Sequence, residues 1–296
     1  MLKFIKDRIL PIAMITGALT YQWVSYLSFL MPYLLFAMLL LTFCKISLKD
    51  IRFQPAHIWL LLIQLVGSIV IYYTLLPFNA VIAQGAMLCL LTPTATAAAV
   101  ITGLLGGNVG FLTAYVLFCN CAVAIAAPVY FSLTGVNEEF TFLQSVGYIC
   151  QKVLPILLLP LLVSFAIRYL TPKIHKALLG IPQLAFYLWV AALIIVTGTT
   201  VKLMFRQSNA DYSIEIGLLI VSLLLCCLQF IAGRRIGKHY GDAISAGQGL
   251  GQKNTILAIW MAQTYLHPLT AIAPAGYILW QNIINSYQLY RKGKKG

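Results

Sequence analysis

The sequence has 296 residues, of which 61% are hydrophobic and only 9% are charged. Ordinary globular domains are about 45–50% apolar and about 25% charged, so this composition excludes a soluble enzyme, a disordered chain and a collagen-like fibre. A net charge of +13 would suggest nucleic-acid binding in a soluble domain, but here the basic residues lie in short clusters between apolar runs. We therefore expect an all-α, multi-pass membrane protein that binds no nucleic acid.

Apolar stretches long enough to cross a bilayer, about 20 residues each, recur along the whole chain. They cover roughly residues 9–26, 29–46, 57–75, 79–105, 110–133, 147–169, 183–204, 213–233, 239–264 and 268–289. The first follows a basic tail but precedes no A-x-A-like cleavage site, so we expect a retained transmembrane helix rather than a signal peptide. The sequence therefore predicts ten transmembrane helices.

The basic residues predict the orientation of these helices. With ten crossings, 16 of the 20 lysines and arginines fall on one side of the membrane. They lie in the N-terminal tail (Lys3, Lys6, Arg8), after the second window (Lys45, Lys49, Arg52), after the sixth (Arg168, Lys173, Lys176), after the eighth (Arg234, Arg235, Lys238) and in the C-terminal tail (Arg291, Lys292, Lys294, Lys295). The opposite side holds Glu138, Glu139 and a mixed segment with Lys202, Arg206, Asp211 and Glu215. The positive-inside rule then places both termini in the cytoplasm, and we expect the inner (plasma) membrane of a bacterium.

Two of the predicted helices are interrupted. Thr-Pro-Thr-Ala-Thr at 92–96 breaks the fourth, and the segment 245–254 with its alternate glycines breaks the ninth. Broken backbone at membrane depth is tolerated only where it is buried in protein or lines a cavity. The breaks occupy the fourth helix of each group of five, and because five is odd the second group enters the membrane inverted. We therefore predict two inverted repeats, residues 1–135 and 136–296, with a binding site at the two breaks.

The glycine run of the second break admits a plainer reading as a helix-packing face. That reading leaves unexplained why polar residues crowd into the same stretch: Gln248, Gln252, Lys253 and Asn254. Polar residues inside a membrane are costly and usually mark substrate or ion pathways. The run matches neither a dinucleotide fingerprint nor a P-loop, because its spacing is GxGxG and no glycine precedes the lysine.

Lys253 is the one basic residue that we expect well inside an apolar window, since every other is expected in a loop, a tail or at a helix end. A lysine near a helix end can snorkel to the interface. About 13 residues separate Lys253 from the expected outer end near Leu266, however, which is roughly 20 Å of helix rise. We therefore expect a buried or cavity-lining ammonium, with carbonyl groups of the two breaks and the lone amide Gln64 as acceptors.

Other polar side chains complete the predicted site. Thr94 and Thr96 are expected to cap the second half of the fourth helix, so that both second half-helices direct positive dipole ends at the crossing. Asn120 is expected to bridge helices, and Gln281 and Asn282 to line the cytoplasmic approach, with Asn285 in the same polar group. No pair of cysteines has a CxxC spacing and the histidines are isolated from one another, so the sequence predicts no metal site.

At these residues the sequence resembles the bile acid:sodium symporter family, and most closely its prokaryotic ten-helix members. The matching pieces are Pro93-Thr94-Ala95-Thr96-Ala97-Ala98-Ala99 with Gly107-Asn108-Val109, Gly251-Gln252-Lys253-Asn254-Thr255-Ile256-Leu257-Ala258, and Pro274-Ala275-Gly276 followed by Trp280-Gln281-Asn282. The resemblance implies a panel domain of helices 1, 2, 6 and 7 and a core domain of helices 3–5 and 8–10, in which broken helices 4 and 9 cross. It also implies transport of organic anions, from bile acids to small carboxylates, by alternating access of the core against the panel.

The departures from that family concern its sodium sites. At the first site, Ala98 and Ala99 stand where the family carries a serine and an asparagine, and Gly249 stands where it carries an acidic residue. Hydroxyl ligands expected on helix 5 align with Leu112 and Val116. The first sodium site is therefore predicted to be lost.

At the second site a glutamine typical of helix 9 aligns with Lys253, whereas the helix 3 glutamine is kept as Gln64. An ammonium group can donate to the same oxygens that would ligate sodium. We predict that the Lys253 ammonium, with Gln64 and Gln248 beside it, replaces the second sodium ion, and that no cofactor or resident metal is bound. A buried lysine can also bind and release a proton, which makes proton coupling the leading alternative to uniport.

The sequence as a whole predicts a secondary transporter, not an enzyme. Its partners would be an organic anion, membrane lipid and, with proton coupling, protons. The predicted substrate-binding residues are Thr94, Thr96, Asn254, Thr255, Gln281 and Asn282. Three alternatives stay open: a membrane receptor or sensor that kept the fold without transport, a sodium symporter with a relocated ion site, and an intramembrane enzyme.

Overall fold

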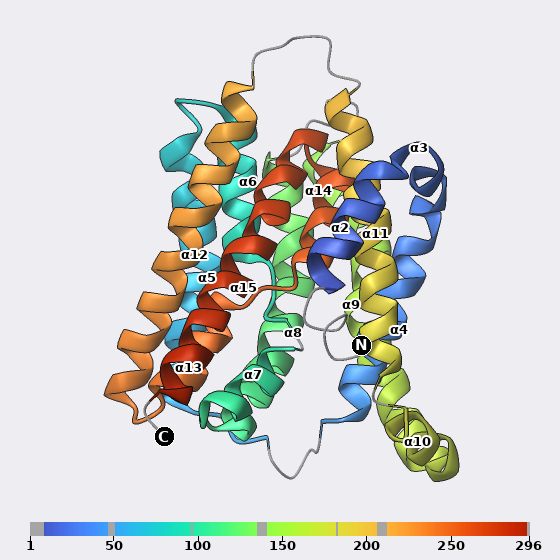
Figure 1. The fold of residues 1–296 in the computed structure, drawn as a ribbon, viewed down its shortest axis with the longest axis vertical. Helices are drawn as coiled ribbons and strands as arrows, with labels where there is room; N and C mark the ends of the chain where they lie inside the picture. The colour runs from blue at the N-terminus through green and yellow to red at the C-terminus, as the bar shows by residue number, and fades with distance from the viewer. Residues whose placement is uncertain are drawn as a thin grey trace. The chain divides into compact units, whose positions relative to one another are not determined.

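The computed structural model describes residues 9–46, 51–95, 97–134, 141–181, 183–205 and 212–294. Every regular element within these residues is helical (Figure 1). Several residues named in the sequence prediction lie outside the described residues: Lys3, Lys6, Arg8, Lys49, Thr96, Glu138, Glu139, Arg206, Asp211 and Lys295.

The chain divides into two compact units, each made of two separate stretches of sequence. Unit 1 contains Met1–Lys45 and Leu154–Asp211. Unit 2 contains Ile46–Val153 and Tyr212–Gly296. Helix α9 (Phe142–Leu170) crosses the boundary between the two units.

Unit 1 is built around α11. Besides its part of α9, the unit contains α2 (Ile9–Leu19), α3 (Tyr21–Val24), the 3-10 helix η1 (Ser25–Leu30), α4 (Met31–Cys44), α10 (Pro172–Leu179) and α11 (Leu184–Phe205). Gly17 and Gly198 lie where α2 and α11 approach each other, and a Cβ on Gly198 would lie 3.1 Å from the Gly17 carbonyl oxygen. The window predicted as one helix over 9–26 is wrong at its end, because α2 ends at Leu19 and the chain continues through two short helices.

Unit 2 is built around α12, against which α13, α6 and α15 pack (Figure 1). Its helices are α5 (Pro55–Leu75), α6 (Ala80–Leu91), α7 (Ala98–Leu105), α8 (Val109–Thr134), α12 (Ser213–His239), α13 (Ala243–Gly251), α14 (Thr255–Tyr265), the 3-10 helix η3 (Pro268–Ala271) and α15 (Ile272–Gly293). Asn79 caps α6, since its Oδ1 accepts hydrogen bonds from the Val81 and Ile82 amides at 2.9 and 3.0 Å. Gly85 permits the close contact of α6 with α12, because a Cβ there would collide with Leu218.

Six helical segments among the described residues are long and apolar enough to cross a membrane. They are Tyr21–Cys44, Pro55–Leu75, Val109–Thr134, Phe142–Leu170, Leu184–Phe205 and Ser213–His239. The prediction of a multi-pass, all-α membrane protein is therefore confirmed. Each predicted break lies between two short helices, α6 and α7 at the first break and α13 and α14 at the second. None of these four helices is long enough for a full crossing. The count of ten crossings stays a prediction.

The expectation that every basic residue other than Lys253 lies in a loop, a tail or at a helix end is wrong, and Lys253 itself lies in the break between α13 and α14. Helix α9 begins at Phe142, earlier than the apolar window suggested, and this places Lys152 in the helix interior. The two lysines differ in burial, because Lys152 is exposed with its ammonium 5.7 Å from the centre of the Tyr148 ring, whereas Lys253 is buried. The distinguishing property of Lys253 is therefore its burial.

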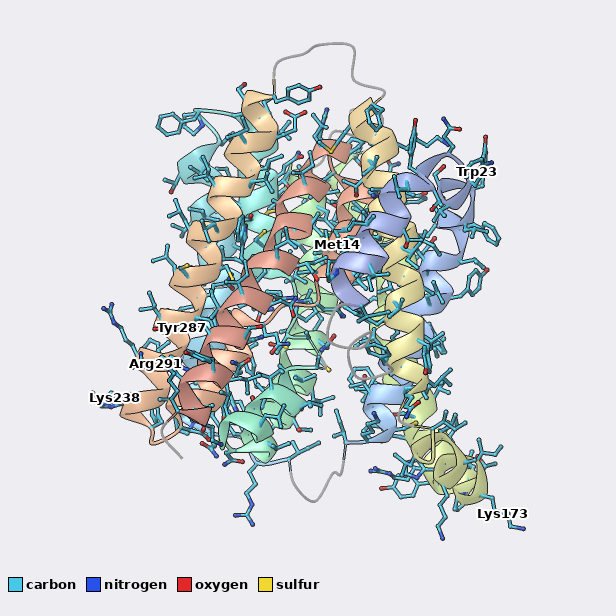
Figure 2. The ribbon with its side chains drawn as sticks, viewed as in Figure 1. Met14, Trp23, Lys173, Lys238, Tyr287 and Arg291 are labelled. Atoms are coloured by element: carbon cyan, nitrogen blue, oxygen red, sulfur yellow. The ribbon has the colours of Figure 1, made fainter. Side chains whose placement is uncertain are left out.

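Basic residues gather at one end of unit 2. Figure 2 shows Lys238 at the end of α12 and Arg291 at the same end of α15. This matches the predicted grouping of these two clusters on one side of the membrane, and the cytoplasmic assignment of that side stays a prediction.

Candidate binding site at the crossing of two broken helices

The two predicted breaks meet inside unit 2 and pair through their backbones. Thr94 and Lys253 form an isolated antiparallel bridge. On either side of it the Ala95 amide donates to the Gln252 carbonyl at 2.9 Å, and the Asn254 amide donates to the Pro93 carbonyl at 2.8 Å. The unwound segments therefore satisfy part of each other's backbone hydrogen bonding, as buried backbone requires.

The carbonyl groups at the end of α6 receive their hydrogen bonds from side chains. Pro93 ends the helix, and the last four carbonyls of a helix have no partner within it. Three side chains donate to these carbonyls: Gln229 Nε2 to Cys89 at 3.3 Å, Lys253 Nζ to Leu90 at 2.8 Å, and Gln64 Nε2 to Leu91 at 2.8 Å and Thr92 at 3.1 Å. The C-terminal end of α6 thus becomes a cluster of oxygens that faces one ammonium and two amides.

Lys253 brings a positive charge to the negative end of the α6 dipole. Its side chain is only 1% exposed, and its ammonium donates to Leu90. A cation beside a helix C-terminus is stabilised by the dipole, and burial strengthens this interaction. Glu215 and Asp242 are the acidic residues in the described part of the chain, and the structure shows no ion pair between either and Lys253. The Leu90 carbonyl, at the negative end of the α6 dipole, is therefore the partner that the structure shows for this ammonium.

The end of α13 is satisfied in the same manner. Thr94 Oγ1 donates to the Gly249 carbonyl at 2.5 Å, and the Tyr277 hydroxyl donates to the Gly251 carbonyl at 2.8 Å. Gln229 Nε2 in turn donates to the Tyr277 hydroxyl at 3.0 Å, which connects this cluster to that of α6. Each break therefore uses side chains from other helices to replace the hydrogen bonds it loses.

An aromatic side chain fills the space beside the second break. The Tyr115 hydroxyl donates to Gln64 Oε1 at 2.7 Å. A Cβ on Gly249 would lie 2.9 Å from the Tyr115 ring and 3.4 Å from Leu112. Leu112 and Val116 pack with Ala98 in an apolar cluster. Apolar side chains therefore fill the positions at which the sequence differs from the family it resembles. The contacts around Gly249 leave no room for an acidic side chain at that position.

Three expected contacts are wrong. Gln64 does not accept from Lys253, because its amide is used by the α6 carbonyls and its oxygen by Tyr115. Thr94 does not cap α7, because its hydroxyl donates across the crossing to Gly249. Asn120 does not bridge helices, since its Nδ2 donates to Val116 of the same helix at 2.7 Å.

The two half-helices that follow the breaks begin differently. Asn254 Oδ1 accepts from the Leu257 amide at 3.3 Å and so caps α14, with Thr255 buried beside it. Helix α7 begins after Ala97 without a side-chain cap. The predicted contribution of Thr96 lies outside the described residues.

The predicted residues of α15 and α13 divide between the crossing and its surroundings. Gln281 lies at the crossing, where its Oε1 accepts from the Lys253 amide at 2.9 Å. Asn282 lies one residue away and donates to Ile278 of its own helix at 2.6 Å. Gln248 is buried but donates to Asn285 at 2.9 Å, toward α15. Sequence reasoning missed Gln229, although a lone amide in the apolar run of α12 was the same signal that singled out Gln64.

Comparison with known proteins gives one distant relative. The chain is 21% identical over 285 residues to an uncharacterised sodium-dependent transporter, YocS, of Bacillus subtilis, and the alignment covers 90% of this chain and 83% of that protein. No family model matches the chain. The chain is thus a multi-pass, all-helical membrane protein with distant similarity, along most of its length, to a sodium-dependent transporter.

Proposed function

We propose that this protein is a secondary transporter of an organic anion, bile-acid-like or a small carboxylate, in which the Lys253 ammonium replaces a transported sodium ion. The observation that carries the proposal is the buried ammonium bonded to the Leu90 carbonyl at the crossing. The distant similarity to a sodium-dependent transporter supports transport as the activity. Lys253 is the reason to expect that sodium itself is not required.

The contacts of Lys253 favour its role as a stand-in for a cation. Backbone carbonyls and side-chain amide oxygens are the ligands that a sodium ion would take, and an ammonium group donates to the same oxygens. Here the end of α6 supplies these carbonyls, and Gln64 holds two of them. When it is protonated, Lys253 supplies the positive field of a bound ion without binding a sodium ion from solution.

The electrostatics of the crossing favour an anionic substrate. Helix α14 and the eight-residue helix α7 both begin directly after a break, so their N-terminal amides face the breaks. Helix N-termini attract anions. The Lys253 charge adds to this field. We propose that Thr94, Thr96, Asn254, Thr255 and Gln281 surround the carboxylate of the substrate.

The organisation of the chain supports alternating access. Each compact unit combines residues from both predicted repeats, as a panel and a core domain would require, although the first segment of unit 2 continues beyond residue 135 to Val153 within α9. The two breaks lie at corresponding places, between α6 and α7 and between α13 and α14, and both belong to unit 2. We propose that unit 2 is the core that carries the site and unit 1 is the panel.

The proposal is tested first by ligand binding and then by flux. Purified protein is screened by thermal unfolding with organic anions, among them taurocholate and pyruvate, in choline and in sodium buffers. A ligand that binds only the native state raises the unfolding temperature with its concentration. We expect a stabilising anion to act equally in both buffers and to be taken up by proteoliposomes. Saturable binding without uptake would instead indicate a receptor on the same fold.

A further inference from the structure

Helix α15 carries a stripe of polar side chains that runs from the crossing to the end of the helix. The stripe consists of Gln281, Asn285, Gln288 and Lys292. Their spacing of four, three and four residues places them on one face of an α-helix. Ile283 and Tyr287, at intermediate positions, are each 59% exposed and lie on a different face.

The stripe begins at the backbone of Lys253 and continues along α13. Gln281 Oε1 accepts from the Lys253 amide at 2.9 Å. One turn further, Gln248 Nε2 of α13 donates to Asn285 Oδ1 at 2.9 Å and to Gln288 Oε1 at 3.1 Å. An unbroken series of amides therefore leads away from the crossing between these two helices.

The other end of the stripe is basic and open. Arg234 Nη2 donates to Gln288 Oε1 at 2.8 Å, and Lys292 Nζ donates to the Leu104 carbonyl at 2.9 Å. Burial falls along the stripe, from Gln281 and Asn285, which are buried, to Gln288, which is half-buried, and Lys292, which is exposed. In Figure 2, Arg291 lies at this end of α15, so the amide series ends among positive charges.

Two buried amide oxygens beside the stripe lack a hydrogen-bond donor within the described part of the chain. They belong to Gln248, which is 1% exposed, and to Gln252, which is 6% exposed and directly follows α13. Each unsatisfied buried group costs about 1–3 kcal/mol, so such an oxygen favours a water partner. These oxygens are suited to accept hydrogen bonds from water that enters along the stripe.

The charges along the stripe favour one sign of solute. At the inner end Gln281 bonds to the Lys253 backbone amide, whereas the Lys253 ammonium donates to Leu90 of α6. Arg234 and Lys292 lie at the outer end. Asp242, at the start of α13, is the acidic residue described at this end of unit 2. The balance along the stripe is therefore positive, as an anion route requires.

We infer that the stripe of α15, together with Gln248, forms a hydrated route through which a small organic anion passes between the crossing and the basic end of unit 2. This inference rests on the proposed transport of an anion. It assigns a role to Asn285 and Gln288 in place of Asn282, whose amide is bonded within its own helix.

Thiol modification in lipid nanodiscs tests the route. Asn285→Cys and Gln288→Cys variants are treated with an anionic and a cationic methanethiosulfonate reagent, and the modified thiol is located by peptide mass spectrometry. Each rate is divided by the rate for free cysteine. We expect both variants to react, Gln288→Cys faster than Asn285→Cys, and the anionic reagent to have at least about a tenfold advantage. Ile283→Cys, two residues before Asn285, is the matched control and should not react, because we expect the exposed apolar face of α15 to contact lipid, which a charged reagent does not enter.

The outcomes separate the route from the proposed function. Equal normalised rates for the two reagents, or no reaction at either stripe position in a protein that transports an anion, would overturn the route. Selective anionic modification in a protein that shows no flux would support the route and contradict the proposed function. If Asn285→Cys does not fold, the half-buried Gln288→Cys carries the same comparison of reagents.

Discussion

The side chains that matter most at the crossing are those that donate to backbone carbonyls. Gln64, Gln229, Lys253 and Thr94 each replace hydrogen bonds that a continuous helix would have made for itself. Lys253 differs from the others because it also brings a charge. A residue of this kind has two roles, one in the stability of the break and one in the field that a ligand experiences.

The hydroxyl of Thr94 gives a first prediction. Thr94→Val keeps the side-chain shape but leaves the buried Gly249 carbonyl without its donor, so the free energy of unfolding should fall by about 1–3 kcal/mol. Chemical unfolding in mild detergent measures the change. Thr74→Val is the control, because Thr74 is exposed on α5 and bonds only to Val70 of its own helix. Equal losses for the two variants would show that the crossing bond contributes nothing specific.

The pair of Gln64 and Tyr115 gives a second prediction. Gln64→Leu leaves the Leu91 and Thr92 carbonyls and the Tyr115 hydroxyl without their partner, whereas Tyr115→Phe removes one bond. A double-mutant cycle should therefore show a coupling of about 0.5–3 kcal/mol, as expected for residues in one network. Additive single effects would contradict the connection of α5 to α8 through this bond.

At the scale of elements, the breaks depend on close contacts that only glycine permits. A Cβ on Gly251 would collide with the ring of Phe230 on α12. We predict that Gly251→Ala lowers the free energy of unfolding by about 1–3 kcal/mol, the usual cost of overpacking. Gly147→Ala is the matched control, because a Cβ there meets no atom within 4 Å and alanine favours helix. A neutral Gly251→Ala would mean that α12 and α13 repack freely.

The elements also show how far sequence reasoning reaches. Both breaks could be predicted, because Pro93 and the alternate glycines act on the local backbone. The end of α2 at Leu19 and the start of α9 at Phe142 could not, because apolar windows record membrane burial rather than helix ends. The burial of Lys253 and a carbonyl group as its acceptor were predictable from its position, but the particular carbonyl was not, because only the crossing of the two breaks brings Leu90 of α6 next to Lys253.

At the scale of the molecule, the central feature is a buried lysine in a chain that is distantly similar to a sodium-dependent transporter along most of its length. The Lys253 ammonium lies at the crossing in unit 2, where we propose that it replaces an ion. Apolar side chains occupy the positions of the other sodium site, which we predict to be lost. If the Lys253 charge replaces sodium, transport either follows the substrate's own gradient without accumulation or is driven by coupled protons.

The most direct measurement of this claim is anion uptake into proteoliposomes with sodium replaced by choline at constant pH and ionic strength. We predict unchanged uptake by the wild-type protein in choline. Lys253→Gln, which restores an amide where the charge was, should lower uptake in choline and regain part of it in sodium. Strong sodium dependence of the wild-type protein would contradict the account, and so would a Lys253→Gln variant that transports as well as the wild type without sodium.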